Sequence, residues 1–133
     1  MAEREFDEGI VDPGREIIVT EPARLEDGKH TGTITNLVYR DTPFKYADLH
    51  IKPDGKDFEL KVGYPQKISP GSALGDLLSR FGIQLVKGQN INLYKEVVGK
   101  KTEFVTISET VRKNGSEREY SRIVKESVRP LKQ

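Results

Sequence analysis

Apolar and polar residues alternate with a period of two along much of the chain, a pattern that predicts β-strands. Residues 31–40 are rich in β-branched side chains, and residues 46–51 and 58–64 alternate strictly. In the alternating runs, one face should pack into a core while the other faces solvent. Pro53-Asp54-Gly55 predicts a tight turn between two of these strands.

The period then changes to about 3.6 residues, which predicts a single helix over about residues 70–81. Ser69 is the expected N-cap with Pro70 in the first turn, and Gly82 follows where a left-handed cap would end the helix. We expect the apolar stripe of this helix to plug the core. The stripe consists of Leu74, Leu77, Leu78 and Phe81.

After the helix, three further runs predict strands over residues 90–98, 102–112 and 118–128. Asn114-Gly115 lies between the last two and is a strong signal for a β-hairpin. Near the N-terminus, the β-branched run at residues 16–19 predicts a short edge strand.

Three antiparallel strands, a short helix and then two or three more strands is the element order of an OB-fold. The predicted class is therefore mostly β, an OB-fold-like five- to six-stranded antiparallel barrel with the helix between strands 3 and 4. We expect an acidic mobile arm at residues 1–14, one barrel domain at residues 15–130 and a tail at residues 131–133.

Charge is distributed unevenly along the chain. Residues 1–27 contain nine Asp or Glu and three Arg, a net charge of −6, whereas residues 28–133 carry a net charge of +7. A basic body is typical of a polyanion binder, although an ordinary soluble surface can carry the same charge. The acidic arm therefore predicts competition with nucleic acid for the basic body at low salt; the alternative is a solubilising tail.

Composition argues against several other classes of protein. The chain has no cysteine and two histidines, so disulfides and His- or Cys-based metal sites are not expected, and an intracellular, cytoplasmic location is the default. No secretory signal or membrane-spanning apolar stretch is visible. No catalytic triad, phosphate-binding loop or zinc-protease motif is present, so we expect no enzyme and no cofactor.

Several short motifs carry a family resemblance over about residues 28–130. They are Gly32-Thr33-Ile34, Tyr46-Ala47-Asp48-Leu49, Ser72-Ala73-Leu74-Gly75-Asp76-Leu77-Leu78 before Phe81-Gly82, and Val98-Gly99-Lys100-Lys101 before Val128-Arg129-Pro130. In these motifs the chain resembles small phage and archaeal OB-like proteins associated with single-stranded DNA. The resemblance implies sequence-tolerant binding of single-stranded nucleic acid, most simply DNA, in replication or repair; an RNA ligand stays open.

Binding of a single strand requires aromatic faces for the bases and cations along the backbone path. Phe44, Tyr46 and Tyr94 are the best aromatic candidates, since Tyr64 shares a face with apolar residues and should be buried. The alternative function is an OB-like interaction or assembly module without nucleic-acid binding, which would pair with itself or a protein partner through an edge strand or the acidic arm. The predicted nucleic-acid site consists of Arg40, Phe44, Lys45, Tyr46, Lys61, Tyr94, Lys100, Lys101, Arg112, Lys113 and Arg118.

Overall fold

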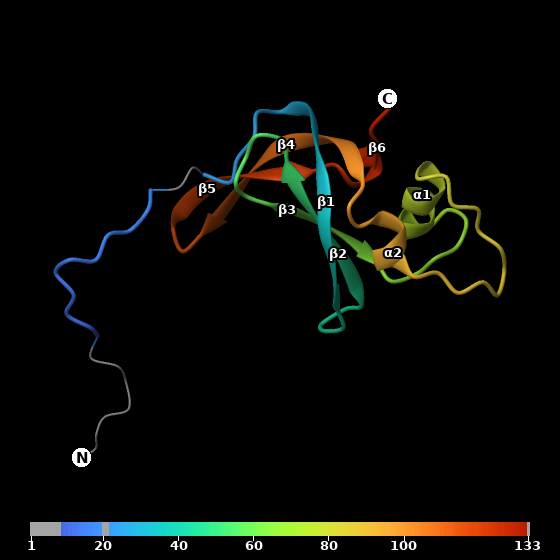
Figure 1. The fold of residues 1–133 in the computed structure, drawn as a ribbon, viewed down its shortest axis with the longest axis horizontal. Helices are drawn as coiled ribbons and strands as arrows, with labels where there is room; N and C mark the ends of the chain where they lie inside the picture. Colours follow the sequence, from blue (N-terminus) through green and yellow to red (C-terminus); the bar gives the residue numbers. More distant parts are fainter. Residues whose placement is uncertain (1–8, 20–21, 133) are drawn as a thin grey trace, which may run out of the picture.

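The computed structural model describes residues 9–19 and 22–132, which form a mostly β structure with one six-stranded antiparallel sheet and two α-helices (Figure 1). The sheet order is β3-β2-β1-β4-β5, and β6 pairs with β4. None of the helices in the described part of the chain is long and apolar enough to cross a membrane. The elements are β1 (Gly28–Arg40), β2 (Tyr46–Pro53), β3 (Leu60–Pro65), α1 (Ala73–Arg80), α2 (Leu93–Val97), β4 (Lys101–Lys113), β5 (Ser116–Ile123), the 3-10 turn η1 (Lys125–Ser127) and β6 (Arg129–Pro130).

The alternation read from the sequence correctly predicts the core-facing side of the central strands. In β2 the residues Ala47, Leu49 and Ile51 are buried, as are Leu60, Val62 and Tyr64 in β3. Phe58 precedes β3 instead of opening it and packs only partly against this core. Burial raises the pKa of Tyr64, whose hydroxyl donates a hydrogen bond of 3.0 Å to the carbonyl of Lys125.

The sheet is strongly curved but does not close into the predicted barrel. β3 and β5 come close to each other, yet each forms hydrogen-bonded pairs on one side only, with β2 and β4 respectively. A β-bulge between Ile34 and Asn36 helps β1 to bend between its two partners. At Gly32 an added Cβ would lie 2.6 Å from the carbonyl oxygen of Lys52, so glycine allows β1 and β2 to approach here.

The predicted helix is present as α1, but it is shorter than residues 70–81 and has a different cap. Ser72, not Ser69, is the N-cap, because its side chain accepts a hydrogen bond of 2.9 Å from the Gly75 N–H. Gly82 follows the helix with φ +83°, as expected for a left-handed end. All four residues of the apolar stripe are buried, so the predicted contribution of α1 to the core is confirmed.

The strand predicted at residues 90–98 is wrong, because residues 93–97 form the helix α2. Asn92 caps this helix by accepting a hydrogen bond of 3.1 Å from the Lys95 N–H. Leu93 and Val97, four residues apart, are both buried. A β-like composition is therefore overridden by the capping residue and by burial at helical spacing.

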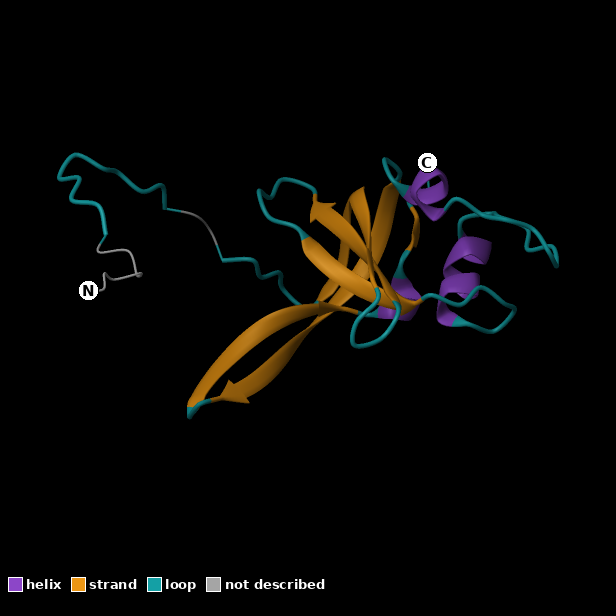
Figure 2. Ribbon diagram, turned by 90° about the horizontal axis from the view of Figure 1, so that it is seen from below, coloured by secondary structure: helices purple, strands orange, loops and turns teal. Residues whose placement is uncertain are grey.

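The strands β4 and β5 form a long hairpin that projects from the sheet (Figure 2). Its turn is Asn114-Gly115, with φ values of 54° and 78°, so the predicted hairpin is confirmed. The strand predicted to run to Val128 ends at Ile123, however, and residues 125–127 form η1. Ser127 supports that turn by accepting a hydrogen bond of 2.8 Å from the Val105 N–H.

The edge strand predicted at residues 16–19 is also wrong. This segment has no strand structure, and Ile17, Ile18 and Val19 are 84%, 86% and 94% exposed. It pairs with no strand of the described sheet, and β-branched residues alone do not make a strand. Of the predicted acidic arm, residues 1–8 lie outside the described part of the chain, and residues 9–14 are exposed.

Candidate nucleic-acid interface

The polar sides of β1, β2 and β3 form one surface that faces away from the core, here called the outer face. Pairing places Arg40 opposite Tyr46 and His50 opposite Lys61. Asp48 lies between these two rows, opposite Gly63. The residues of β2 that were predicted to point away from the core therefore do so, and three of the predicted binding residues share this surface.

On the outer face the Arg40 side chain contacts both Asp48 and Tyr46. The Arg40 guanidinium donates two hydrogen bonds to the Asp48 carboxylate, of 2.5 Å from Nε and 3.0 Å from Nη2, and these raise its pKa. The same guanidinium lies 5.3 Å from the centre of the Tyr46 ring, and the Lys125 ammonium lies 6.0 Å from it. Tyr46 is therefore a half-buried ring flanked by two cations.

Glycine at position 63 allows this ring to lie against β3. A Cβ at Gly63 would come within 3.0 Å of Cδ2 of Tyr46 and within 2.9 Å of Oδ1 of Asp48. The alternating pattern identifies Gly63 as an outward position but does not indicate that two side chains of β2 fill the space above it.

The loop between β1 and β2 adds an aromatic ring and a cation at the edge of the outer face. Phe44 is 70% exposed, and Lys45 beside it is exposed as well. Lys52 and Lys61 are further exposed cations on β2 and β3. Among the residues that the structure describes, none of these three lysines forms an ion pair, so their charges are available to a ligand.

A second hydrogen-bonded group lies farther along the outer face. Glu59 accepts a hydrogen bond of 2.5 Å from the Thr35 hydroxyl, and its other oxygen lies 3.3 Å from Nδ1 of His50. The Thr35 hydrogen bond, aided by His50 and opposed by partial burial, lowers the pKa of Glu59. On the outer face His50 is thus paired with Glu59.

Lys100 and Lys101 are predicted to lie between two strands; in the structure Lys100 lies in the turn that leads from α2 into β4, and Lys101 is the first residue of β4. Lys101 forms an ion pair of 3.1 Å with Asp54, which also accepts a hydrogen bond of 2.7 Å from Thr31. The Thr31 hydrogen bond and then that of Lys101 lower the pKa of Asp54. Lys101 therefore connects the turn after β2 to the start of β4. Lys100 is exposed as well, and within the described structure it forms no ion pair.

The remaining predicted residues are not on the outer face of β1 to β3. Tyr94 is 51% exposed but belongs to α2, so it has no place on a strand face. Arg112, Lys113 and Arg118 lie near the tip of the β4–β5 hairpin, beyond the end of β1 at which Gly28 pairs with Thr106. The loop holding Phe44 follows the opposite end of β1, and Figure 1 shows the two in different parts of the molecule.

Two further side chains, Lys125 beside the outer face and Tyr120 on the hairpin, are not among the binding residues predicted from the sequence. Lys125 reaches the rings of Tyr46 and Tyr64 from η1, at 6.0 Å and 5.8 Å, a contact that no local pattern can predict. Tyr120 is 47% exposed on β5 and pairs with Glu109. Counting the register outward from Asn114-Gly115 would have placed it on the same side as Arg118.

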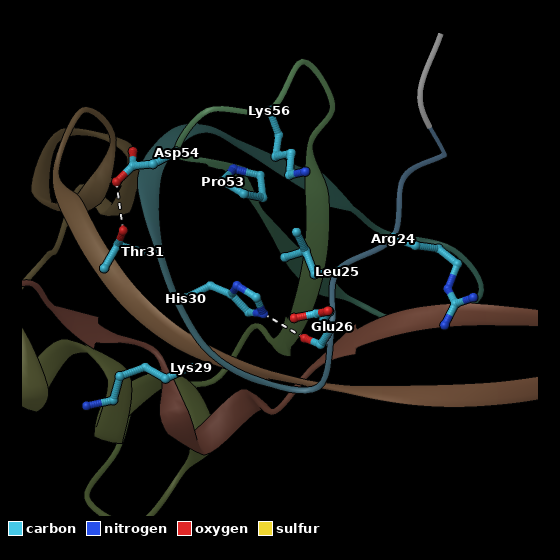
Figure 3. A pocket seen from close by; sticks show the side chains of 9 residues that line it. All are labelled: Arg24, Leu25, Glu26, Lys29, His30, Thr31, Pro53, Asp54 and Lys56. Carbon is cyan, nitrogen blue, oxygen red and sulfur yellow. Dashed lines mark hydrogen bonds between the residues drawn. The ribbon is translucent and has the colours of Figure 1, made fainter.

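A pocket of about 590 Å³ opens at another end of the sheet, between the start of β1 and the turn after β2 (Figure 3). Its polar groups largely bond one another: Thr31 with Asp54, and His30 Nε2 with the carbonyl of Glu26 at 2.7 Å. Acids and bases are mixed around its rim. The lining residues are Arg24, Leu25, Glu26, Lys29, His30, Thr31, Pro53, Asp54 and Lys56.

The described residues contain no group of three or more His, Asp or Glu side chains suited to a metal ion. No protein-family model matches the chain, and no curated protein matches it in sequence.

Proposed function

We propose that the chain is an OB-fold-like module that binds single-stranded nucleic acid, most simply DNA, without sequence specificity. The strand order β3-β2-β1-β4-β5, with α1 between β3 and β4, supports an OB-like architecture whose barrel remains open between β3 and β5. In that architecture the face of strands 2 and 3 and the loops beside it are the usual ligand surface.

One observation carries the proposal: the outer face combines aromatic rings with lysines that form no ion pair with any residue of the described ranges 9–19 and 22–132. Phe44 offers an exposed ring on which a base can stack, a contact of about 1–3 kcal/mol per base. Lys45, Lys52 and Lys61 offer charges for phosphates. Arg40 is held by Asp48 through two of its N–H groups, so the others remain free to donate.

The roles of Tyr46 and Arg40 follow from their contact. Tyr46 is too covered to be the main stacking platform, and it acts instead as a positioning residue. Its ring lies 5.3 Å from the Arg40 guanidinium, a planar group that can itself stack on a base.

The test is a titration of the full chain with a fluorescent oligothymidine at about 50 mM salt and above. We expect log K to fall linearly with log salt, and Lys45→Gln to reduce the slope by about 0.7. Phe44→Ala should weaken binding at least about fivefold, whereas Phe44→Tyr should not. Lys87→Gln, at an exposed position in the loop before α2, is the matched charge control. Absence of binding by the unmodified chain at about 50 mM salt would reject the proposal.

A second candidate, an assembly module, is favoured by a different observation. Ile17, Ile18 and Val19 are almost fully exposed, and β5 is an edge strand with unpaired backbone groups. A segment of this kind can add to the edge of another chain by strand pairing. Light scattering over a range of concentrations distinguishes the two: a mass that grows with concentration and falls back on Ile17→Lys supports assembly.

A further inference from the structure

Residues 107–122 are the part of the β4–β5 hairpin that extends beyond β1. They are here called the arm, which is distinct from the acidic segment at residues 1–14. Its register assigns alternate residues to two faces, since residues opposite each other share a face. The inner face continues the core side of the sheet and consists of Ser108, Thr110, Arg112, Glu117, Glu119 and Ser121. The outer side of the arm consists of Ile107, Glu109, Val111, Lys113, Ser116, Arg118, Tyr120 and Arg122.

The inner face is already engaged by other parts of the chain. The Leu25 N–H donates a hydrogen bond of 2.7 Å to Ser121, and Arg24 forms an ion pair of 2.9 Å with Glu119. Arg112 forms an ion pair with Glu117 across the strands. The cation of this face, Arg112, is therefore neutralised by a neighbouring acid.

The outer side of the arm is different in charge and in exposure. Val111 and Tyr120 are 41% and 47% exposed, and they line a shallow hollow of about 310 Å³ with Lys113 and Arg118. In the described structure neither of these two cations has an ion-pair partner. Arg122 is paired with Glu109 at 3.3 Å, so the side as a whole carries a net charge of +2.

We infer that the outer side of the arm is a second contact for the single strand bound at the outer face, an inference that rests on the proposed function. Tyr120 would stack on a base, while Lys113 and Arg118 would neutralise phosphates. An exposed ring that lines one hollow with two unpaired cations matches a polyanion with flat bases. Arg112 is excluded from this role by its pairing with Glu117, although its position in the sequence suggested it.

The arm is connected to the first surface through the sheet itself. Its outer side continues along β4 to Lys101, whose partner Thr33 in β1 pairs in turn with Lys52 in β2. A strand longer than the outer face can therefore meet a second set of contacts on the same side of the sheet. A short strand held by Phe44 and Arg40 would not reach them.

The experiment compares oligothymidines of about 6 and about 20 nucleotides, lengths chosen around the 4–16 nucleotides that OB-folds usually cover. We expect Tyr120→Ala and Arg118→Ala each to weaken binding of the long strand at least about fivefold and to change the short strand by less than about twofold. Arg112→Ala, on the inner face, is the matched control and should have no effect on either length. Because all three side chains are exposed, the variants should fold as the original chain does.

Each other outcome has a definite meaning. If Phe44→Ala weakens binding while the outer-side variants do not, the arm inference fails and the proposed function stands. If Arg112→Ala weakens the long strand as much as Arg118→Ala, the contact is unspecific charge and the inference fails. If the unmodified chain binds neither length, the proposed function itself fails. Loss of self-association in Tyr120→Ala, without loss of DNA binding, would show a protein contact and overturn the inference.

Discussion

The two halves of the β4–β5 pair have the same alternation of side chains but differ in burial. In the first half of β4, Thr102, Phe104 and Thr106 face inward and are completely buried. In the arm the alternation continues without a break, yet nearly every residue is exposed. The difference lies in the partner: β1 pairs only with the first half of β4, since it begins at Gly28, opposite Thr106. Alternation thus sets the side of a strand, and a neighbouring element decides whether that side becomes core or ligand surface.

The largest expected difference between the two halves is in stability. Phe104→Ala removes a fully buried ring and should lower the free energy of unfolding by about 3–5 kcal/mol. Val111→Ala, on the same strand but in the arm, should change it by less than about 0.5 kcal/mol. Urea unfolding of both variants measures the contrast. Equal losses would mean that the arm packs against the body in solution.

A subtler contrast uses the same substitution in two tyrosines. Tyr64→Phe removes the hydroxyl that donates to the Lys125 carbonyl and should lower the free energy of unfolding by about 1 kcal/mol. For Tyr120, whose hydroxyl forms no hydrogen bond within the described structure, the Phe variant should be neutral. Thermal unfolding of the two variants and of the unmodified chain measures this difference in stability. A neutral Tyr64→Phe would place that hydroxyl in contact with water.

The body of the sheet was predictable from sequence where the signal is local. Strict alternation gave the core side of β2 and β3, a stripe at helical spacing gave α1, and Asn114-Gly115 gave the hairpin turn. Each of these depends on the conformation of a few consecutive residues and on one buried side. The helix start was misplaced because Ser69 and Ser72 both precede it, and only the bond to the Gly75 N–H distinguishes them.

Features that depend on distant partners were not predictable. Residues 93–97 form a helix because Leu93 and Val97 reach the core together, and η1 interrupts a β-like run beside Val105. In the candidate site, the Tyr46 ring is contacted by the ammonium of Lys125, which is far away in sequence. The basic residues of the hairpin formed one group in the sequence, and only their register and ion pairs separate Arg112 from Arg118.

A smaller effect concerns the acid response of the body. Hydrogen bonds from Thr31 and then Lys101 hold the pKa of Asp54 below its ordinary value of 3.8. A carboxylate with a lowered pKa stabilises the fold at higher pH, and that contribution is lost as the pH falls below its ordinary pKa. Asp54→Asn should therefore flatten the loss of stability below about pH 4, by well under 1 kcal/mol since the group is exposed. Urea midpoints from pH 3 to pH 7 measure this, and an unchanged acid slope would contradict it.

The last prediction concerns the acidic N-terminal residues. It tests whether they compete with nucleic acid at the outer face or at the arm. Residues 1–14 contain five acidic side chains and one arginine. Arg24 forms an ion pair and Leu25 a hydrogen bond with the inner face of the arm, so the N-terminal segment joins the sheet beside the arm and not beside the loop that holds Phe44. Deleting residues 1–14 should therefore strengthen binding of the long oligothymidine about two- to fivefold at low salt, and the gain should vanish at high salt, where screening removes it. The short strand should gain less. An equal gain for both lengths would place the competing charge at the outer face instead, and no gain at low salt would mean that the segment does not compete with nucleic acid at all.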